Sequence, residues 1–283
     1  MAHQTQTDPI KIQPRDAHFA FQDAPRRDWL NGDPVRTLAF NALSITFPAG
    51  ERFFIRSVMN MRKQITDPKL LADIKLFVAQ EGAHTREHIA YNDQLEQQGY
   101  RAGLLHRITE ARLDFAERKL SAKAKLAVTC ALEHYTAVLA QELLSNPDLL
   151  EGADEAYRNV WGWHAIEEIE HKGVAFDVFQ QAMSGKAYWL RVRSMMIVAL
   201  LFLTNMARAH YVLMNDVGLG RSVRAWGRLT WFLWGKPGLF RKMIWHTFAY
   251  MRPGFHPWDD DNRDLIQKAE KSLQTDGSLH AAA

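Results

Sequence analysis

Two short motifs in this sequence combine a glutamate with a histidine three positions later. They are Glu81-Gly-Ala-His84 and Glu168-Ile-Glu-His171. In a helix, this spacing places the carboxylate and the imidazole one turn apart on the same face. Such oxygen and nitrogen donors are typical ligands of iron, manganese and zinc. One motif of this kind arises by chance in many helices, so a metal site requires further ligands that join the two pairs.

Two other segments each supply one glutamate on an apolar stripe, Glu51 and Glu133. The resulting order along the chain is Glu, E-x-x-H, Glu, E-x-x-H, which is the ligand pattern of di-iron and di-manganese carboxylate bundles. Carboxylates are rarely buried unless they are paired or bind a metal. We therefore predict a two-metal site. Glu51 follows Pro48 and Gly50 closely, so its alternative place is a first helical turn, where the helix dipole stabilises negative charge.

Two more histidines lie on the same stripes as the motifs. His164 precedes Glu168 by four residues, and we predict a third histidine ligand, with a supporting or merely buried histidine as the alternatives. His88 follows His84 by four residues and is expected to orient a ligand carboxylate by a hydrogen bond. The predicted metal ligands, which are also the predicted catalytic residues, are Glu51, Glu81, His84, Glu133, His164, Glu168 and His171. The glutamates that fall off the stripes, and are expected to be solvated, are Glu87, Glu142, Glu167 and Glu170.

Helical periodicity, rather than strand-like alternation, positions these residues. Apolar residues recur every three or four positions over segments 48–64, 68–98, 121–145 and 153–184. Segment 104–118 predicts a short helix within a long crossover between the second and third segments. Two helical hairpins joined by a long crossover form the ferritin-like four-helix bundle. The predicted fold is therefore all-α, a ferritin-like four-helix bundle with additional C-terminal helices.

The C-terminal part differs from the bundle in composition. Between Val217 and Trp258 no residue is acidic, seven are basic, and five of the nine tryptophans occur. The uncharged run 194–207 precedes this stretch and is too short to span a bilayer by itself. Basic residues mixed with tryptophan are typical of helices at an anionic membrane surface, so peripheral membrane contact through 194–258 is one hypothesis. A core or oligomer interface and a full membrane span are the alternatives.

Composition sets broader limits on the protein. The chain has 283 residues, is 47% hydrophobic and carries a formal net charge of +3, which does not indicate nucleic-acid binding. The single Cys130 excludes an intramolecular disulfide, and the N-terminus lacks the apolar stretch of a signal peptide. We expect a cytoplasmic protein, with the inner face of the membrane as the place of any peripheral contact. The expected divisions are a loosely structured segment 1–34, a metal-binding bundle 35–185, a helical extension 186–260 packed on it, and a C-terminal helix and tail 261–283.

Several blocks of the sequence also resemble a known family. They are FPAGERFF (47–54), QEGAHTREH (80–88), ALEHYTA (131–137), WHAIEEIEHK (163–172) and RPGFHPWD (252–259). In this order, over residues 35 to 260, they resemble the bacterial family labelled predicted metal-dependent hydrolase. The ligand motifs separately resemble those of the di-iron N-oxygenases that oxidise p-aminobenzoate, with E-x-x-H on one helix and H-x-x-x-E-x-x-H on another. That second resemblance is limited to the ligand motifs.

From these features we predict a non-haem di-iron oxidoreductase that activates O₂ to oxidise an apolar small molecule or a lipid-like substrate. An electron-donor protein is then an expected partner, and no nucleic acid is. The predicted cofactor is two iron ions, with manganese, a mixed iron–manganese pair or zinc as alternatives. The preference for oxygen chemistry rests on analogy with other bundles. The alternative is a dinuclear metal-dependent hydrolase, and a third hypothesis is a non-enzymatic iron-binding protein.

Overall fold

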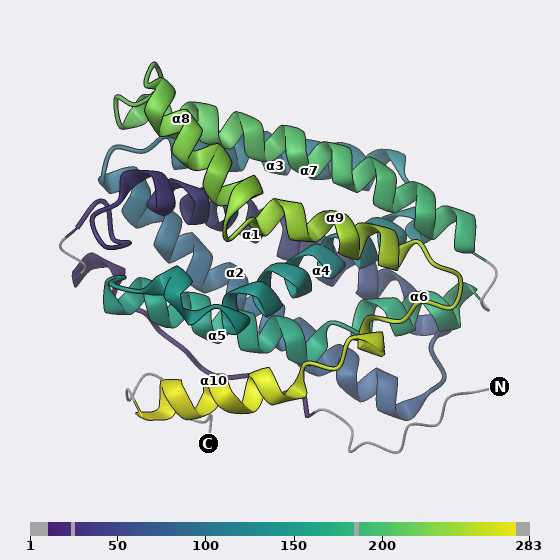
Figure 1. Ribbon diagram of the computed structural model, residues 1–283. Helices are drawn as coiled ribbons and strands as arrows, with labels where there is room; N and C mark the ends of the chain where they lie inside the picture. The colour runs from purple at the N-terminus through teal and green to yellow at the C-terminus, as the bar shows by residue number, and fades with distance from the viewer. Residues whose placement is uncertain (1–10, 24–25, 184–186, 276–283) are drawn as a thin grey trace.

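In the computed structural model, the described residues are 11–23, 26–183 and 187–275. Their regular structure is helical, and within these ranges the only β-type pairing is one antiparallel bridge between Leu30 and Ala153. The all-α prediction is confirmed. Four long helices pack into a bundle of the ferritin-like type, with further helices along its sides (Figure 1).

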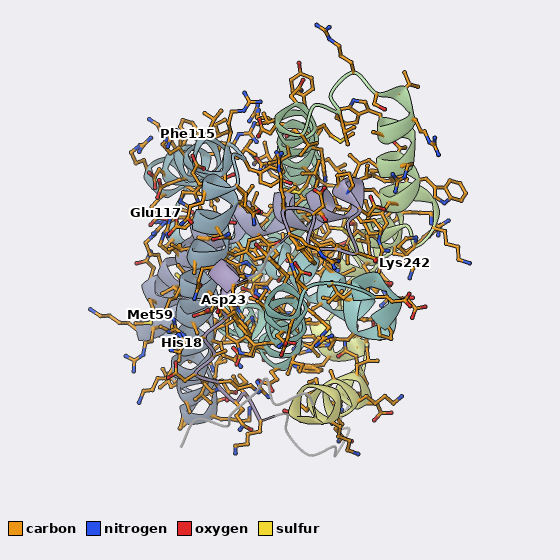
Figure 2. The ribbon with its side chains drawn as sticks, turned by 90° about the vertical axis from the view of Figure 1, so that its left-hand side faces the viewer. His18, Asp23, Met59, Phe115, Glu117 and Lys242 are labelled. Carbon is orange, nitrogen blue, oxygen red and sulfur yellow. The ribbon has the colours of Figure 1, made fainter. Side chains whose placement is uncertain are left out.

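The bundle consists of two helical hairpins. Its helices are α1 (Pro34–Met61), α2 (Pro68–Gln97), α4 (Ala122–Ser145) and α5 (Glu155–His171). Helix α1 packs on α2, α4 packs on α5, and α1 also packs on α4, which joins the two hairpins. The helix α3 (Ala102–Lys119) runs the length of the crossover and is longer than the short helix that we predicted there. Its Phe115 lies at the outer surface of the molecule (Figure 2).

Helix α1 begins well before the predicted boundary at residue 48. Asp33 caps it, because its side chain accepts hydrogen bonds from the backbone N–H groups of Val35 and Arg36, and Pro34 occupies the first helical position. Glu51 therefore lies in the middle of a 28-residue helix. The alternative that placed Glu51 in a first turn is therefore wrong. The helix dipole does not stabilise its charge, because that effect is confined to the terminal turns.

Pro48 misled the prediction because a proline inside a helix usually ends or kinks it. It lacks the N–H that would bond to the carbonyl four residues earlier, that of Ser44. Here the Asn92 side-chain amide of α2 donates to the Ser44 carbonyl oxygen at 3.1 Å. The freed acceptor is thus satisfied by a neighbouring helix, and α1 continues through Pro48.

The last predicted segment of the bundle is interrupted. Helix α5 ends at His171, and α6 (Val174–Met183) follows after Lys172 and Gly173. The Lys172 ammonium donates to the Asp260 carbonyl at 2.7 Å, and a Cβ on Gly173 would lie 2.7 Å from Trp258 Nε1. The break therefore occurs where residues 258–260 of the C-terminal extension pack against the bundle.

The N-terminal segment is packed rather than loosely structured over its described part, residues 11–23 and 26–34. Phe21, Trp29 and Leu30 are buried, and Trp29 stacks on Tyr157 with ring centroids 4.7 Å apart. Charges and prolines in the sequence favour a loose segment here. Its tertiary contacts, rather than local structure, order it. Residues 1–10 of the predicted segment lie outside the described residues.

The C-terminal extension adds helices on two sides of the bundle. They are α7 (Tyr188–Asp216), α8 (Val223–Thr230), the π-helical turn η4 (Trp231–Gly235), α9 (Leu239–Tyr250) and α10 (Arg263–Thr275). Helix α7 packs on α4 and α1, α9 packs on α4, and α10 packs on α5 on the opposite side (Figure 1). By length and composition α7 could cross a membrane, but in this fold it lies along the bundle.

Candidate metal centre

The structure brings all seven predicted ligands together in the interior of the bundle. Glu51 comes from α1, Glu81 and His84 from α2, and Glu133 from α4. Helix α5 supplies the remaining three, His164, Glu168 and His171. Each of the seven residues is at most 4% exposed. These side chains share one space because the inward stripes of four helices meet at the same height in the bundle.

Glu168 is the centre of one half of the cluster. Its Oε1 lies 3.1 Å from Nε2 of His164 and 3.6 Å from Nδ1 of His84. The same His84 nitrogen lies 3.9 Å from Glu81 Oε2. Ligand atoms of Glu51, Glu81 and His84 also lie within 4.8 Å of one another. This half therefore offers two imidazole nitrogens and up to three carboxylates to one ion.

His171 is the centre of the other half. Its Nε2 lies 3.2 Å from Glu81 Oε1. The same nitrogen is 3.6 Å from Glu133 Oε2 and 3.6 Å from Glu168 Oε2. Glu81 and Glu168 thus reach both halves: each carboxylate has one oxygen in one half and its other oxygen in the other half. This is the arrangement of carboxylates that bridge two metal ions.

The atoms that face the centre have no hydrogen-bond partner in the protein. They are Glu51 Oε1, both carboxylate oxygens of Glu81 and of Glu133, Glu168 Oε2, His84 Nδ1, His164 Nε2 and His171 Nε2. A buried polar atom without a partner is costly, and such atoms rarely converge in a native protein. A divalent cation would supply the missing partner to all of them at once. The residues present therefore fit a metal centre.

Hydrogen bonds outside the cluster determine which nitrogen of His84 and His171 faces it. His84 donates from Nε2 to Glu167 Oε2 at 3.1 Å, which leaves Nδ1 with its lone pair toward the centre. His171 has its Nδ1 at 3.0 Å from Gln80 Oε1. Gln80 donates its Nε2 to Glu170 Oε2 at 2.7 Å, so its Oε1 must be the acceptor for His171. His171 therefore presents Nε2 to the centre.

A longer chain of hydrogen bonds orients His164. Asn92 donates to the Ser44 carbonyl, so its Oδ1 accepts from the Ser44 hydroxyl at 2.9 Å. The Ser44 oxygen then accepts from Nδ1 of His88 at 2.9 Å, and His88 Nε2 accepts from Nδ1 of His164 at 3.0 Å. His164 is left with an unprotonated Nε2 toward the centre. We predicted that His88 would bond to a ligand carboxylate; its partner is instead an imidazole.

Electrostatics in the metal-free cluster favour bound protons. Burial raises the pKa of Glu51, Glu81 and Glu133 well above the ordinary range. Burial acts in the same direction on Glu168, but the close imidazoles of His164 and His171 take that pKa well below the ordinary value. Burial lowers the pKa of His171, yet Glu168 and other carboxylates raise it to about 9. Metal ions must therefore compete with protons for this site.

Two glutamates that matter for the site were predicted wrongly. Glu167 and Glu170 are 0% and 4% exposed rather than solvated, and both bind the guanidinium of Arg15. Glu167 Oε1 also accepts from the Arg15 backbone N–H at 3.0 Å and from Trp163 Nε1 at 3.1 Å. The only available signal was the density of apolar and aromatic residues in α5, which is buried on every side in its second half. Glu87 and Glu142, also expected to be solvated, are buried as well. His134, which is adjacent to Glu133 in the sequence, points away from the cluster, with Nε2 at 3.0 Å from the His246 carbonyl.

Comparison with known proteins gives one match. A family model described as "Predicted metal-dependent hydrolase" matches residues 13–261. No curated protein and no solved structure matches the chain. The matched range includes Arg15 and the C-terminal helices α7 to α9, so it extends beyond the blocks that carry the resemblance in the sequence.

Removal of one ligand should lower the metal content. We expect Glu133→Ala and His171→Ala each to lose at least one metal ion per chain, because each residue contributes unpaired donor atoms to the cluster. Helical content should be largely retained, as measured by circular dichroism beside elemental analysis. Glu155→Ala, an exposed glutamate at the start of α5, is the control and should keep full metal content. Full metal content in both site variants would show that the assignment is wrong.

Substitution of a residue that orients a ligand should weaken metal binding without removing a site. In Gln80→Leu, His171 Nδ1 loses its acceptor, and we expect affinity for Zn²⁺ to fall about 10- to 100-fold at unchanged stoichiometry. Competition with a chromophoric chelator measures both quantities. The matched control is Gln97→Leu, at the exposed end of the same helix. Equal affinities for the two variants would contradict the orienting role.

The stability of the metal-free protein should fall as pH rises from 7 to 8. In this range the unfolded chain has ionised Glu51, Glu81 and Glu133 and a largely neutral His171, whereas in the native state burial of the glutamates, and the carboxylates around His171, favour the protonated forms. Because the native state then binds more protons than the unfolded state, the free energy of unfolding decreases with pH. His84 and His88, whose pKa values burial lowers well below the ordinary range, oppose this trend toward its lower limit. Lys172, whose pKa burial lowers to about 8, opposes it toward higher pH. Thermal unfolding with a chelator measures the slope, and a rising melting temperature would refute the prediction.

Proposed function

This chain belongs to the family of predicted metal-dependent hydrolases, and on that premise we propose that it is a dinuclear metal hydrolase acting on a substrate with a long apolar part. The observation that carries the proposal is a pocket of about 200 Å³ whose inner end is lined by Glu51, His164 and Glu168. Its walls are mainly apolar side chains of α1, α3, α4 and α7. The pocket therefore connects the cluster of unpaired ligand atoms to a space shaped for hydrocarbon.

We assign the two metals to the two halves of the cluster. Glu81 and Glu168 would bridge them, and Glu133 and His171 would complete one coordination sphere. The other sphere would be completed by Glu51, His84 and His164. When bound, such metals lower the pKa of a water molecule and polarise a carbonyl or phosphoryl oxygen.

The chain's own residues would hold the substrate along the pocket. Thr85 donates to Glu51 Oε2 at 2.9 Å and so presents Oε1 at the inner end. Toward the outer end, Arg112 donates to Asn205 Oδ1, and Asn205 donates to Thr109, each at 3.3 Å. Arg112 and Asn205 both line the pocket, and a guanidinium there suits a carboxylate or phosphate group. The favoured substrate is an ester or amide of a long-chain acid whose other end carries a carboxylate or phosphate group.

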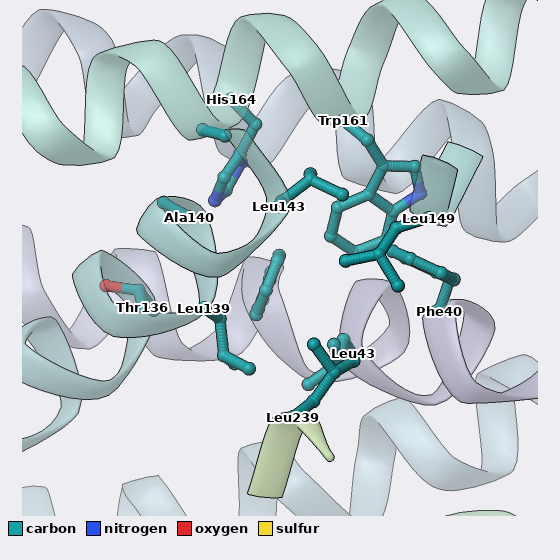
Figure 3. Close-up of a pocket in the computed structure, with 12 residues that line it drawn as sticks. Phe40, Leu43, Thr136, Leu139, Ala140, Leu143, Leu149, Trp161, His164 and Leu239 are labelled. Atoms are coloured by element: carbon teal, nitrogen blue, oxygen red, sulfur yellow. The ribbon is translucent and has the colours of Figure 1, made fainter. Parts of the chain in front are cut away.

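A second candidate is oxidation of an apolar substrate by O₂. It is favoured by a separate cavity of about 30 Å³ that also reaches His164 (Figure 3). Its lining is apolar except for His164, Thr136 and the Trp161 ring nitrogen, and cavities of this kind hold apolar gases more readily than water. The same pocket would then hold the substrate to be oxidised, and an external electron donor would be required.

Metal content and reactivity measured on the same sample distinguish these candidates. We expect about two metal ions per chain and hydrolysis of p-nitrophenyl esters, with kcat/KM rising up to about fourfold for each added methylene that the pocket buries. Glu133→Ala should abolish hydrolysis, whereas the control Glu155→Ala should not. O₂ consumption by the anaerobically purified iron form without ester hydrolysis would replace the proposal by the second candidate. Uptake of many irons per chain would indicate storage, and absence of metal would overturn all three.

A further inference from the structure

The outward sides of α7, η4 and α9 carry large apolar side chains that no described part of the chain covers. Those with the largest exposed fractions are Trp189 at 76%, Trp245 at 72%, Trp231 at 66%, Leu200 at 64% and Phe248 at 59%. Helices α7 and α9 lie side by side (Figure 1). A groove of about 170 Å³ between them is lined by further exposed residues, including Met196, Leu203, Trp234 and Ile244. We call this surface the α7–α9 face. Single exposed apolar residues are common on soluble proteins, but a group of this size indicates an interaction site.

The segment that carries the α7–α9 face is strongly basic. From Tyr188 to Trp258 the sequence has ten basic residues and one acidic residue, Asp216. The side chain of Asp216 is only 6% exposed and accepts from Nε of Arg101 at 2.6 Å. Arg191 is buried, and Lys242 is half-buried beside Glu142. The eight exposed basic residues of the segment are Arg193, Arg208, Arg221, Arg224, Arg228, Lys236, Arg241 and Arg252, of which Arg228 pairs with Asp33 and Arg252 lies 3.9 Å from Asp259. Whatever covers this face must combine an apolar layer with negative charge.

Helices α7 and α9 each carry one exposed arginine one turn away from an exposed tryptophan. On α7 the exposed Arg193 lies four residues after Trp189, and on α9 the exposed Arg241 lies four residues before Trp245. This spacing places each pair on one side of its helix. Tryptophan is favoured at the boundary between lipid head groups and acyl chains, and arginine at anionic head groups.

We propose that the α7–α9 face binds the surface of an anionic lipid bilayer, with both helices lying in the plane of the interface. A spanning orientation of α7 conflicts with its packing on α4 and α1 and with its buried Arg191. That guanidinium donates to the Tyr250 carbonyl and, at 2.8 Å, to the Arg252 carbonyl, which fixes α7 to the end of α9. A second copy of the chain is disfavoured as the occupant, because a two-fold contact would place cations against cations.

The pocket that leads to the metal cluster opens beside this face. Ile197 and Leu201 of α7 line the pocket and are also 45% and 50% exposed, so α7 forms part of its rim. Exposed Leu120, at the end of α3, lines the same rim. An acyl substrate could pass from the bilayer into the pocket without crossing water. This last step rests on the proposed function, whereas the binding of the bilayer does not.

Co-sedimentation of the full chain with vesicles tests the proposal without any activity measurement. We expect binding to vesicles of phosphatidylcholine with phosphatidylglycerol, weaker binding at high salt, and little binding to phosphatidylcholine alone. The double substitution Arg193→Glu and Arg241→Glu should weaken binding by at least roughly thirtyfold, at about fivefold for each neutralised charge before charge reversal is counted. The double substitution Trp189→Ser and Trp245→Ser should weaken it at every salt concentration.

Controls separate a membrane site from general basicity or unfolding. The matched charge control is Lys63→Glu with Lys75→Glu, exposed residues on other elements, which should retain nearly wild-type binding. All variants should keep wild-type helical content and metal content. No vesicle binding at low salt, or equal loss in the control, would overturn the proposal. A dimer in sedimentation velocity that the tryptophan substitutions dissociate would also overturn it, because the face would then be an interface between copies. Vesicle binding with no metal bound would leave the proposal standing and reject only the proposed function.

Discussion

The structure depends on one constraint: three buried imidazoles must each present an unprotonated nitrogen to the same small space. Neutral histidine carries its proton on either nitrogen, so an acceptor behind each ring has to hold that proton. The acceptors here are Glu167 for His84, Gln80 for His171 and His88 for His164. Loss of an acceptor would turn a ligand into a donor that repels a cation. The surroundings of the site therefore matter as much as the ligands themselves.

Two of these three acceptors depend on the N-terminal segment. The Arg15 guanidinium, 5% exposed, binds Glu170 at 2.6 Å and Glu167 at 3.3 Å. Burial raises the pKa of both glutamates, that of Glu167 to about 7, and the positive charge of Arg15 opposes this rise close to four ligand carboxylates. Glu170 in turn fixes the amide of Gln80. A segment with no regular structure thus sets the proton positions on two helices.

The sequence predicted the inward stripes well, because a helix that faces a bundle core repeats its buried positions with a period of 3.6 residues. That period brought Glu81, His84 and Glu168 onto inward faces, where the structure has them. It could not predict what covers the outward faces, so Glu167 and Glu170 were assigned to solvent although a distant segment buries them. The predicted start of α1 was wrong for a similar reason. Pro48 is tolerated only because a side chain of another helix satisfies the Ser44 carbonyl.

The C-terminal extension determines how dry the site is. Without α7, the pocket would lose the wall formed by Ile197, Val198 and Leu201, and Glu51 and Glu168 at its inner end would face open water. Interactions between charges weaken strongly at high dielectric constant, so the raised carboxylate pKa values and the competition between protons and metal both require this cover. The same helix that keeps water out also exposes its other side as an apolar, basic surface. Such an apolar wall admits apolar molecules, whereas a polar molecule would lose its hydration on passing it.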